Sequence, residues 1–174
     1  MKNLLQQKVF SPNDVSLLAV YLSTSAKDLF LFSFSLVFPL TKSQFIEYYE
    51  KNKGENHQFY SVVSTDSGEY CGHFEIKGIY GKHWVVTAAH IFLLPNYRGQ
   101  GLGVKLVNII LDIAFGSFNL YRVGLIVHVI KERAINVYKK CGFDTKVLVR
   151  DVPEFEEERY RLLQMNLLSA HRNR

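Results

Sequence analysis

The feature that most constrains this chain is a change of hydrophobic period near its middle. Between Phe59 and Leu94 the apolar residues fall in short runs bounded by turn residues, which is typical of strands in an antiparallel meander. From Gly101 to Phe115 the apolar residues recur with helical spacing, at Leu102, Leu106, Ile109, Ile110 and Ile113. Strands and helices alternate beyond this point, and that order predicts one parallel crossover in a mixed sheet.

Capping and turn residues predict where the elements begin and end. Ser11 is the expected N-cap of a first helix, with Pro12 at its first position and an apolar face over 15–22. The segment 41–44 has the pattern of a capping box for a second helix, which should end near Lys53 and Gly54. We expect strands at 59–64, 70–80, 84–94, 121–129, 145–149 and 161–168, a turn at 81–82, and a short helix at 132–140 ended by a left-handed Gly142.

These elements predict the α+β fold class: a central mixed, mostly antiparallel sheet with one parallel crossover, flanked by helices. The Phe-rich segment 29–40 is left without an assigned structure. With 174 residues and no repeat or linker, the chain is expected to form one domain over 1–174, with its core at 10–168. A basic tail at 169–174 is expected to be a solvated, frayed end.

Composition excludes several classes of protein. The net charge of +5 is too small and too scattered to indicate a nucleic-acid partner or a membrane surface. The most apolar stretch, 29–40, is too short to span a membrane and is interrupted by serines and Pro39, while residues 1–10 lack the apolar region of a secretory signal. Cys71 and Cys141 have no disulfide or metal-ligand spacing. We therefore expect a cytoplasmic protein that binds no metal, nucleic acid or membrane.

The segment 95–103 is the clearest candidate binding site. It leads directly from a strand into a helix and carries glycines at 99, 101 and 103. Glycines let a ligand approach the backbone closely, and the first N–H groups of a helix have no partner within the helix. With the helix dipole and the charge of Arg98, the turn predicts an anion site, although a turn that only serves packing is the alternative. It lacks the Gly-Lys-Ser/Thr of a P-loop, and Val104 stands where the dinucleotide fingerprint has its third glycine.

Two motifs resemble those of one enzyme family. Residues 98–103, Arg-Gly-Gln-Gly-Leu-Gly, resemble the Arg/Gln-x-x-Gly-x-Gly/Ala signature of the GCN5-related N-acetyltransferase (GNAT) superfamily. About thirty residues later, 131–143 resemble its second motif, Asn-x-x-Ala-x-x-x-Tyr-x-x-x-Gly-Phe, with Ala134, Tyr138, Gly142 and Phe143 in register. The resemblance extends over about residues 10–168. It implies the GNAT fold, with a sheet splayed at the cofactor site, and an acetyl-CoA-dependent N-acetyltransferase as the function.

The resemblance also implies a cofactor site. The amides of the glycine-rich loop would bind the pyrophosphate of acetyl-CoA, and an amide of the splayed strand would polarise the thioester carbonyl. Lys131 replaces the asparagine of the second motif, so it either approaches a CoA phosphate or faces solvent, and of the two we favour solvent. The implied cofactor-binding residues are Phe92, Leu93, Leu94, Arg98, Gly99, Gln100, Gly101, Leu102, Gly103, Val104, Lys131, Ala134 and Tyr138.

Acetyl transfer to an amine needs a base for the ammonium group, donors for the oxyanion and an acid for the departing thiolate. The resemblance implies Tyr138 as the acid, whereas a tyrosine packed in the core is the alternative. Positions 87–89, where the family often has a glutamate or histidine, hold Thr-Ala-Ala, so the neighbouring His90 is the first candidate base. A bulge expected in this strand leaves its direction open. Further candidates are Glu75, His73, His128 and a water route without a dedicated base.

The acceptor stays open between a protein N-terminus and a small amine. In the superfamily the two N-terminal helices and their connection wall the acceptor site, and here that connection carries Phe30, Phe32, Phe34 and Phe38. Aromatic walls suit an amine on a partly apolar group, although core packing explains these residues equally well. The arrangement looks similar to the ribosomal-protein-alanine and spermidine acetyltransferase branch. A polyamine or aminoglycoside site needs carboxylates, which the acidic run 154–158 supplies unless it is only a solvated face.

Two further points stay open. Homodimers are common in the superfamily, but no interface is indicated by the sequence. The rival function is a non-catalytic acyl-CoA-binding or regulatory protein with the same fold. Lys131 and the missing strand glutamate favour that rival, and the retained Tyr138 opposes it.

Overall fold

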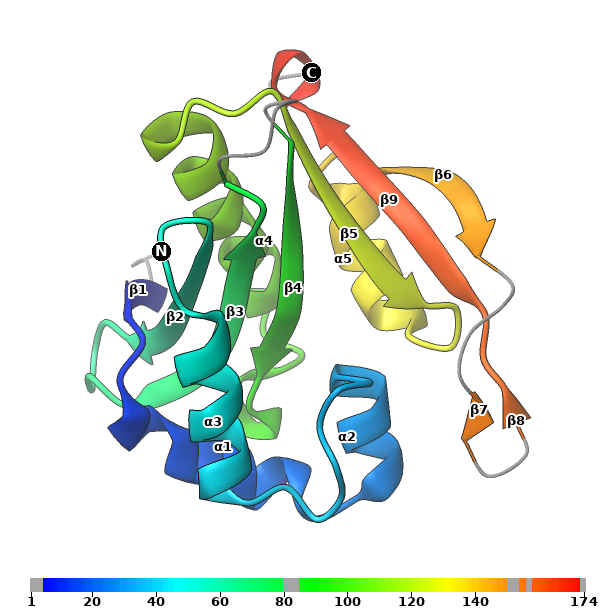
Figure 1. Cartoon of the computed structure of the whole chain (residues 1–174). Helices are drawn as coiled ribbons and strands as arrows, with labels where there is room; N and C mark the ends of the chain where they lie inside the picture. Colours follow the sequence, from blue (N-terminus) through cyan, green and yellow to red (C-terminus); the bar gives the residue numbers. More distant parts are fainter. Residues whose placement is uncertain (1–4, 80–84, 150–153, 156–157, 173–174) are drawn as a thin grey trace.

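A seven-stranded sheet forms the middle layer of the computed structural model, with helices on both faces (Figure 1). The structure describes residues 5–79, 85–149, 154–155 and 158–172. The strands follow the order β1-β2-β3-β4-β5-β9-β6, and among the described pairs only β4–β5 is parallel. The predicted mixed, mostly antiparallel sheet with one parallel crossover is therefore confirmed.

The element bounds lie close to those expected. The main sheet contains β1 (Leu5–Val9), β2 (His57–Ser64), β3 (Tyr70–Lys77), β4 (Val85–Leu93), β5 (Arg122–His128), β6 (Asp144–Val149) and β9 (Leu162–Leu168). The α-helices are α1 (Val15–Leu22), α2 (Ala26–Phe32), α3 (Lys42–Asn52), α4 (Leu102–Leu111) and α5 (Glu132–Lys140). A π-helical turn, η3 (Asp112–Ser117), extends α4, and the 3-10 turns are η1 (Pro12–Asp14), η2 (Pro95–Tyr97) and η4 (Ser169–His171). Expected positions 80–82 and 84 lie outside the described residues.

The predicted helix caps are confirmed, with one correction. Ser11 accepts a hydrogen bond from the Asn13 amide at the start of η1, which leads directly into α1. Thr41 accepts a hydrogen bond from the Gln44 amide at 3.2 Å. The Gln44 side chain does not return to Thr41 as a capping box requires, because it donates to the carbonyl of Pro39 instead. Gly142 has a φ of 92°, which confirms the left-handed end of α5.

Helix α2 and the strands β1, β7 (Glu154–Phe155) and β8 (Glu158–Arg159) were not predicted, and β7 and β8 pair with each other. Strand β1 lies at the edge of the sheet and buries only Leu5, so its polar residues give no alternating pattern. Helix α2 begins at an N-cap, Ser25, whose side chain accepts from the Asp28 amide. Its run of apolar residues has no helical period, and Leu29 is its one buried residue.

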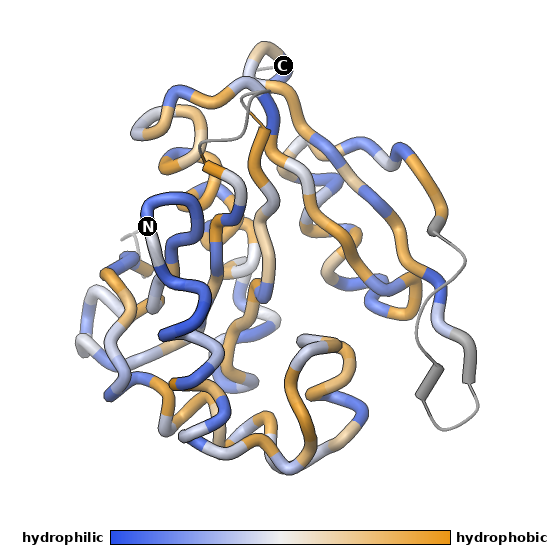
Figure 2. Tube along the Cα trace, in the orientation of Figure 1, coloured by the Kyte–Doolittle hydropathy of each residue, from blue (hydrophilic) through white to orange (hydrophobic). Residues whose placement is uncertain are grey.

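Two cores lie on opposite faces of the sheet. One core joins the sheet to α4 and α5 and includes Phe74 and Leu93. The other joins the sheet to the N-terminal helices and includes Phe45 and Phe92. Figure 2 shows hydrophobic residues along the central strands β4 and β5. The described part of the chain contains no helix that is long and apolar enough to cross a membrane.

Strands β4 and β5 separate along their length. Their pairing runs only from Val85–Thr87 on β4 to Arg122–Gly124 on β5, although β4 continues to Leu93. Beyond this pairing β5 keeps its partner β9 on the other side, so the sheet opens between its two parallel strands. Figure 1 shows this divergence, with α2 lying across the open end. The predicted splay of the sheet is therefore present.

The C-terminal end differs from the expected frayed tail. Residues 169–171 form η4, and the Arg172 guanidinium donates to the Leu111 carbonyl at 3.2 Å and forms an ion pair with Asp112. These contacts hold Arg172 against the end of α4. The expectation of a frayed end is wrong for the described residues, because a single arginine here finds both a carbonyl and a carboxylate partner.

Candidate active site

Strand β4 carries a bulge at the level where it leaves β5. The register between β3 and β4 shifts between His73 and Glu75, so that His90 and Ile91 together oppose one residue, Phe74. The backbone of His90 has a φ of 48°, in the left-handed region that few residues other than glycine adopt. The expected bulge is confirmed, and it decides the direction of the histidine.

His90, within the bulge, and Phe92, after it, both face helix α2. The His90 ring stacks on Phe32 of α2 with ring centroids 4.8 Å apart, and the Phe92 ring meets Phe32 edge-on at 6.0 Å. Only 11% of the His90 side chain is exposed. The histidine therefore lies on the α2 side of the open sheet.

The amides of β4 near its end point in opposite directions. The Leu94 amide donates to the Cys71 carbonyl at 2.8 Å, which directs it toward β3. Because successive amides of a strand alternate, the Leu93 amide points away from β3 and toward the opening beside β5. The Leu93 carbonyl accepts a hydrogen bond from Arg98 Nε at 2.7 Å on the same side. Of residues 92–94, Leu93 is thus the one whose amide is directed into the opening.

The glycine-rich turn has the geometry of an anion site. It follows η2, and both Gly99 (φ 77°) and Gly101 (φ 75°) are left-handed. Gly101 is the N-cap of α4 and offers no side chain to cap it, so the first amides of the helix have no such partner. A Cβ at either glycine would meet nothing within 4 Å, so the glycines are needed for their backbone conformation and not for packing.

The side chains of this loop tie it to its surroundings. The Arg98 guanidinium lies over the rings of Tyr21 and Phe92, 5.4 and 5.2 Å from their centroids, in addition to its bond to Leu93. Gln100 Nε2 donates to the Asn96 carbonyl at 2.8 Å. Arg98 therefore spans from the end of β4 to α1 and holds positive charge at the mouth of the turn.

The second motif packs against the first. A Cβ on Gly103 would lie 3.3 Å from Val137 of α5, so the glycine allows α4 and α5 to approach closely. Tyr138 lies on the buried face of α5, with an exposed fraction of 8% and its ring 6.0 Å from Phe143. Burial raises the pKa of the Tyr138 hydroxyl, and Cys141 contributes in the same direction. The hydroxyl therefore keeps its proton at neutral pH, and the side chain belongs to the core that joins the sheet to α4 and α5.

Lys131 does not face solvent, so that expectation is wrong. Its ammonium group donates to the Leu31 carbonyl, in the last turn of α2, at 2.7 Å. Burial lowers the pKa of Lys131 to about 8, with Asp28 opposing this effect and Arg98 adding to it. A free carbonyl at the end of a helix attracts such a cation, and sequence spacing cannot show this contact between residues 100 positions apart.

A fully buried carboxylate lies behind His90. Glu75 has no exposed surface, and its Oε1 is 2.7 Å from His90 Nδ1 and 3.3 Å from His73 Nε2. Its Oε2 is 2.7 Å from His57 Nε2, and it accepts a hydrogen bond from Tyr48 Oη at 2.9 Å. Lys77 Nζ is 3.3 Å from the same oxygen. Among the described residues, no group of histidine, cysteine, aspartate and glutamate is placed to hold a metal ion.

These contacts decide the charges in the cluster. Burial opposes ionisation of Glu75, but hydrogen bonds from His57, His73 and His90 outweigh it and hold the pKa of Glu75 well below its usual range. Burial lowers the pKa of His90, with Glu75 acting in the opposite direction. At neutral pH the cluster therefore contains an ionised carboxylate beside a neutral His90.

The other candidate bases are less suited to the role. Glu75 itself uses both oxygens in the contacts above, and His73 has no exposed surface. His128, at the end of β5, is 5% exposed, and burial lowers its pKa to about 4, with Lys131 adding to the effect. The rings of Phe30, Phe34 and Tyr160 surround it at 5.3 to 5.8 Å.

None of the phenylalanines of 29–40 is fully buried, although Phe32 packs against the core on the side of the N-terminal helices. Phe34 and Phe38 are 48% and 44% exposed, and Phe30 and Phe32 are partly exposed. Phe30 contacts β5 through His128, while Phe32 contacts β4 through His90. Helix α2 therefore bridges the two separated strands, which favours the wall interpretation of this segment over the core interpretation.

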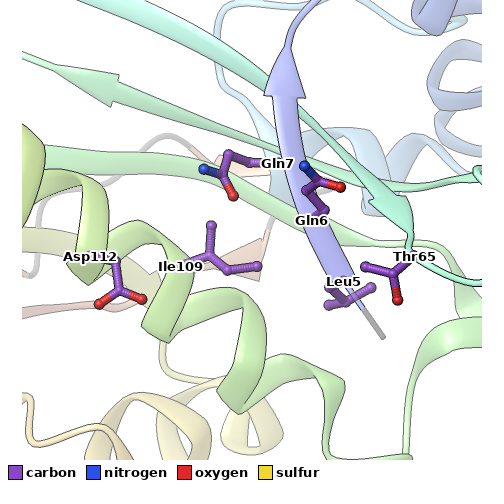
Figure 3. Close-up of a pocket in the computed structure, with 6 residues that line it drawn as sticks. All are labelled: Leu5, Gln6, Gln7, Thr65, Ile109 and Asp112. Carbon is purple, nitrogen blue, oxygen red and sulfur yellow. The ribbon is translucent and has the colours of Figure 1, made fainter. Parts of the chain in front are cut away.

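One described pocket lies away from these residues. It has a volume of about 340 Å³ and lies between β1 and the end of α4 (Figure 3). It is lined by Leu5, Gln6, Gln7, Thr65, Ile109 and Asp112. None of these belongs to the candidate site, and none is a strong acid–base or nucleophilic group apart from the exposed Asp112. The candidate active site is therefore formed by the residues of the two motifs and their neighbours, and not by this pocket.

Comparisons with known proteins agree with the geometry. The model of the acetyltransferase (GNAT) family matches residues 24–143. Spermidine N(1)-acetyltransferase of Escherichia coli K12 is 33% identical over 98 residues, which cover 56% of this chain and 52% of that protein. The Vibrio cholerae enzyme of the same name is 29% identical over 99 residues, 56% of each chain. The chain thus matches about half the length of these curated relatives.

Solved structures of spermidine N-acetyltransferase from Vibrio cholerae have the same fold. The one in complex with CoA and spermine has a TM-score of 0.84 and 19% identity, covering 99% of this chain and all of that one. A dodecameric structure has a TM-score of 0.79 and 19% identity, covering 97% and 96% of the two chains. The family model matches most of the chain, and the two motifs and the splayed sheet are those expected of this family. The chain therefore belongs to the acetyltransferase (GNAT) family.

Proposed function

We propose that this chain transfers the acetyl group of acetyl-CoA to a primary amine. The observation that carries the proposal is the junction of the splayed sheet with the glycine-rich turn. The opening beside β4 leads to a helix N-terminus whose cap, Gly101, adopts a left-handed conformation and offers the first amides no side-chain partner. A thioester in the opening and a pyrophosphate on those amides would lie along one path, and that is the shape of acetyl-CoA.

The residues of this path fit the cofactor. The loop 98–104 would hold the pyrophosphate through backbone amides, with Arg98 adding charge at its mouth. The Leu93 amide, directed into the opening, would donate to the thioester carbonyl and stabilise the oxyanion that forms there. Tyr138, protonated at neutral pH, would donate its proton to the departing CoA sulfur.

The proton balance requires a base. An ammonium acceptor and acetyl-CoA give an N-acetyl amine, free CoA thiol and one proton, so the site must accept a proton in each turnover. His90 is neutral and lies on the α2 side of the opening, where the acceptor would enter. We propose that His90 takes this proton, directly or through one water.

The acceptor is proposed to be an amine carried on an apolar or aromatic group. Relatives of the chain are spermidine acetyltransferases, but the segment 29–46 contains no aspartate or glutamate. Exposed Phe34 and Phe38 and the rings around His128 favour a partly apolar acceptor, and a polyamine would require carboxylates. The formation of a homo-oligomer is a further proposal, which the dodecameric neighbour supports by likeness of fold.

A panel of acceptors tests the proposal. Acetyl-CoA, the chain and one amine at a time are incubated, and the N-acetyl product is measured by mass spectrometry. We expect product with peptides or monoamines that carry an aromatic or aliphatic group beside the amine, at a higher kcat/KM than with spermidine. Preference for spermidine would contradict the acceptor proposal. Product with no amine, together with stabilisation by acetyl-CoA in thermal unfolding, would favour the non-catalytic alternative.

A further inference from the structure

We propose that Glu75 positions the candidate base His90, so that the two residues act as a carboxylate–histidine pair in proton removal from the acceptor. This inference rests on the function proposed above and adds a residue from a neighbouring strand to it. It begins from the shortest contact of His90, 2.7 Å between its Nδ1 and Glu75 Oε1. The family motifs contain neither residue.

The charge of Glu75 fixes the tautomer of the histidine. An ionised carboxylate only accepts hydrogen bonds, so the proton of the neutral imidazole must be on Nδ1. The lone pair then lies on Nε2, at the far end of the ring from the carboxylate. The same division of roles operates in hydrolases, where a buried aspartate orients a histidine and stabilises its imidazolium form.

The remaining contacts keep Glu75 ionised and immobile. Oε2 is held by His57, Tyr48 and Lys77. Tyr48 Oη also lies 3.4 Å from His90 Nδ1, farther than the carboxylate oxygen. The carboxylate thus has partners for its charge even before His90 accepts a proton, which a buried ion requires. Tyr48 also accepts a hydrogen bond from Lys77 Nζ at 2.9 Å, which closes the network on the α3 side.

The fold sets the direction of the pair. His90 reaches Glu75 because the β4 bulge turns its side chain to the face covered by α2 and α3, where Glu75 also points. Phe32 stacks on one face of the imidazole, so ring rotation is restricted as well. A strained backbone of φ 48° at His90 is consistent with a residue that is held in place by its contacts.

The proton inventory of the step is complete. Nε2 of His90 accepts one proton from the acceptor ammonium, the imidazole becomes an imidazolium, and Glu75 stabilises the new positive charge through the existing Nδ1–H bond. The amine attacks the thioester, and Tyr138 donates its proton to the departing CoA sulfur. The attacking nitrogen gives its second proton back to Tyr138, directly or through water, and the imidazolium releases its Nε2 proton to water. Glu75 is neither protonated nor in contact with the acceptor, so its role is positioning.

A spectroscopic experiment tests the pairing without any acceptor. Long-range ¹H–¹⁵N correlation spectra of the ¹⁵N-labelled full chain at pH 7 report which imidazole nitrogen of His90 is protonated, with His90→Gln used for assignment. We expect a protonated Nδ1 and a pyridine-type Nε2. A proton on Nε2, or an imidazolium at pH 7, would overturn the proposal, whatever the enzyme acetylates.

A kinetic experiment tests the consequence. Glu75→Gln removes the charge, so the acidic limb of the kcat profile should move to lower pH and the plateau should fall by about 100-fold, the scale of general base catalysis. Glu50→Gln is the matched control, because it makes the same change at a carboxylate of α3 whose ion-pair partner is the exposed Lys53 and not a residue of this cluster. We expect it to change the plateau by less than about threefold and to leave the acidic limb in place.

The outcomes separate the two proposals. Wild-type chain that neither binds acetyl-CoA nor acetylates an amine contradicts the proposed function itself. Wild-type turnover, with Glu75→Gln retaining the acetyl-CoA-induced stabilisation and the wild-type pH profile, contradicts only the role of Glu75. If Glu75→Gln does not fold, the tautomer measured in the wild-type chain decides the proposal.

Discussion

The left-handed Gly101 gives a sharp test of the cofactor site, because the cost of replacing it can be separated from packing. Its φ is 75°, and a Cβ there would meet nothing within 4 Å. Gly101→Ala should therefore cost only backbone strain, about 1–2 kcal/mol for an L-residue in this region. For a chain of this size, that lowers the Tm by about 2–8 °C.

Gly68 is a matched control in the turn between β2 and β3. Its φ is 71°, and its Cβ would also meet nothing within 4 Å. Gly68→Ala should lose the same stability as Gly101→Ala, since the strain and the free space are alike. The two variants therefore differ only in their place, and any difference in cofactor response comes from the loop at 98–103.

The assay is thermal unfolding with and without acetyl-CoA. A ligand at about 100 times its Kd stabilises the folded chain by about 2.7 kcal/mol, which raises the Tm by about 5–11 °C. We expect this shift in the wild-type chain and in Gly68→Ala. In Gly101→Ala a loss of affinity of at least about tenfold, or about 1.4 kcal/mol, should halve it or remove it. An equal shift in both variants would refute the assignment of the loop.

Three further predictions follow from single contacts. Tyr138→Phe should lower kcat by about 100-fold or more with little change in acetyl-CoA affinity, measured by steady-state kinetics and titration, and an unchanged kcat would remove the tyrosine from the mechanism. Gly72→Ala would place a Cβ against the Phe92 carbonyl oxygen, so β4 must shift. We expect the free energy of unfolding, measured with denaturant, to fall by about 1–3 kcal/mol and cofactor binding to weaken. An unchanged free energy of unfolding would contradict the close packing of β3 and β4. His128 has a folded-state pKa of about 4 against 6.5 in the unfolded chain. Because the unfolded state binds the proton first, the stability of the folded chain should fall as the pH drops from about 6.5 to 4. The fall should be smaller in His128→Leu. If both chains lose the same Tm over this pH range, burial does not lower the pKa of His128.

The sequence was most informative where a residue acts on the backbone within a few positions of it. Ser11, Thr41 and Gly142 marked the ends of helices because caps depend on local conformation alone. The crossover and the splay came from the change of period and from the family motifs. In contrast, β1 could not be found, because an edge strand that buries only Leu5 has no periodic signal.

The site was predictable only in its local parts. The turn around Gly101 shows its conformation in the spacing of its glycines, and the structure has the left-handed angles that such a turn needs. The contacts of Lys131 with Leu31 and of His90 with Glu75 join distant segments, so no local pattern encodes them. The histidine became interpretable only when the bulge fixed its direction and the buried carboxylate appeared behind it.

The most direct test of the central claim is the rate of CoA thiol release from acetyl-CoA, followed with a thiol reagent in the presence and absence of an amine. The account predicts amine-dependent release by the wild-type chain, with Gly68→Ala like the wild type and Tyr138→Phe strongly slowed. Release that does not depend on any amine, or no release by a chain that acetyl-CoA stabilises, would contradict the claim that this family member is an acetyltransferase.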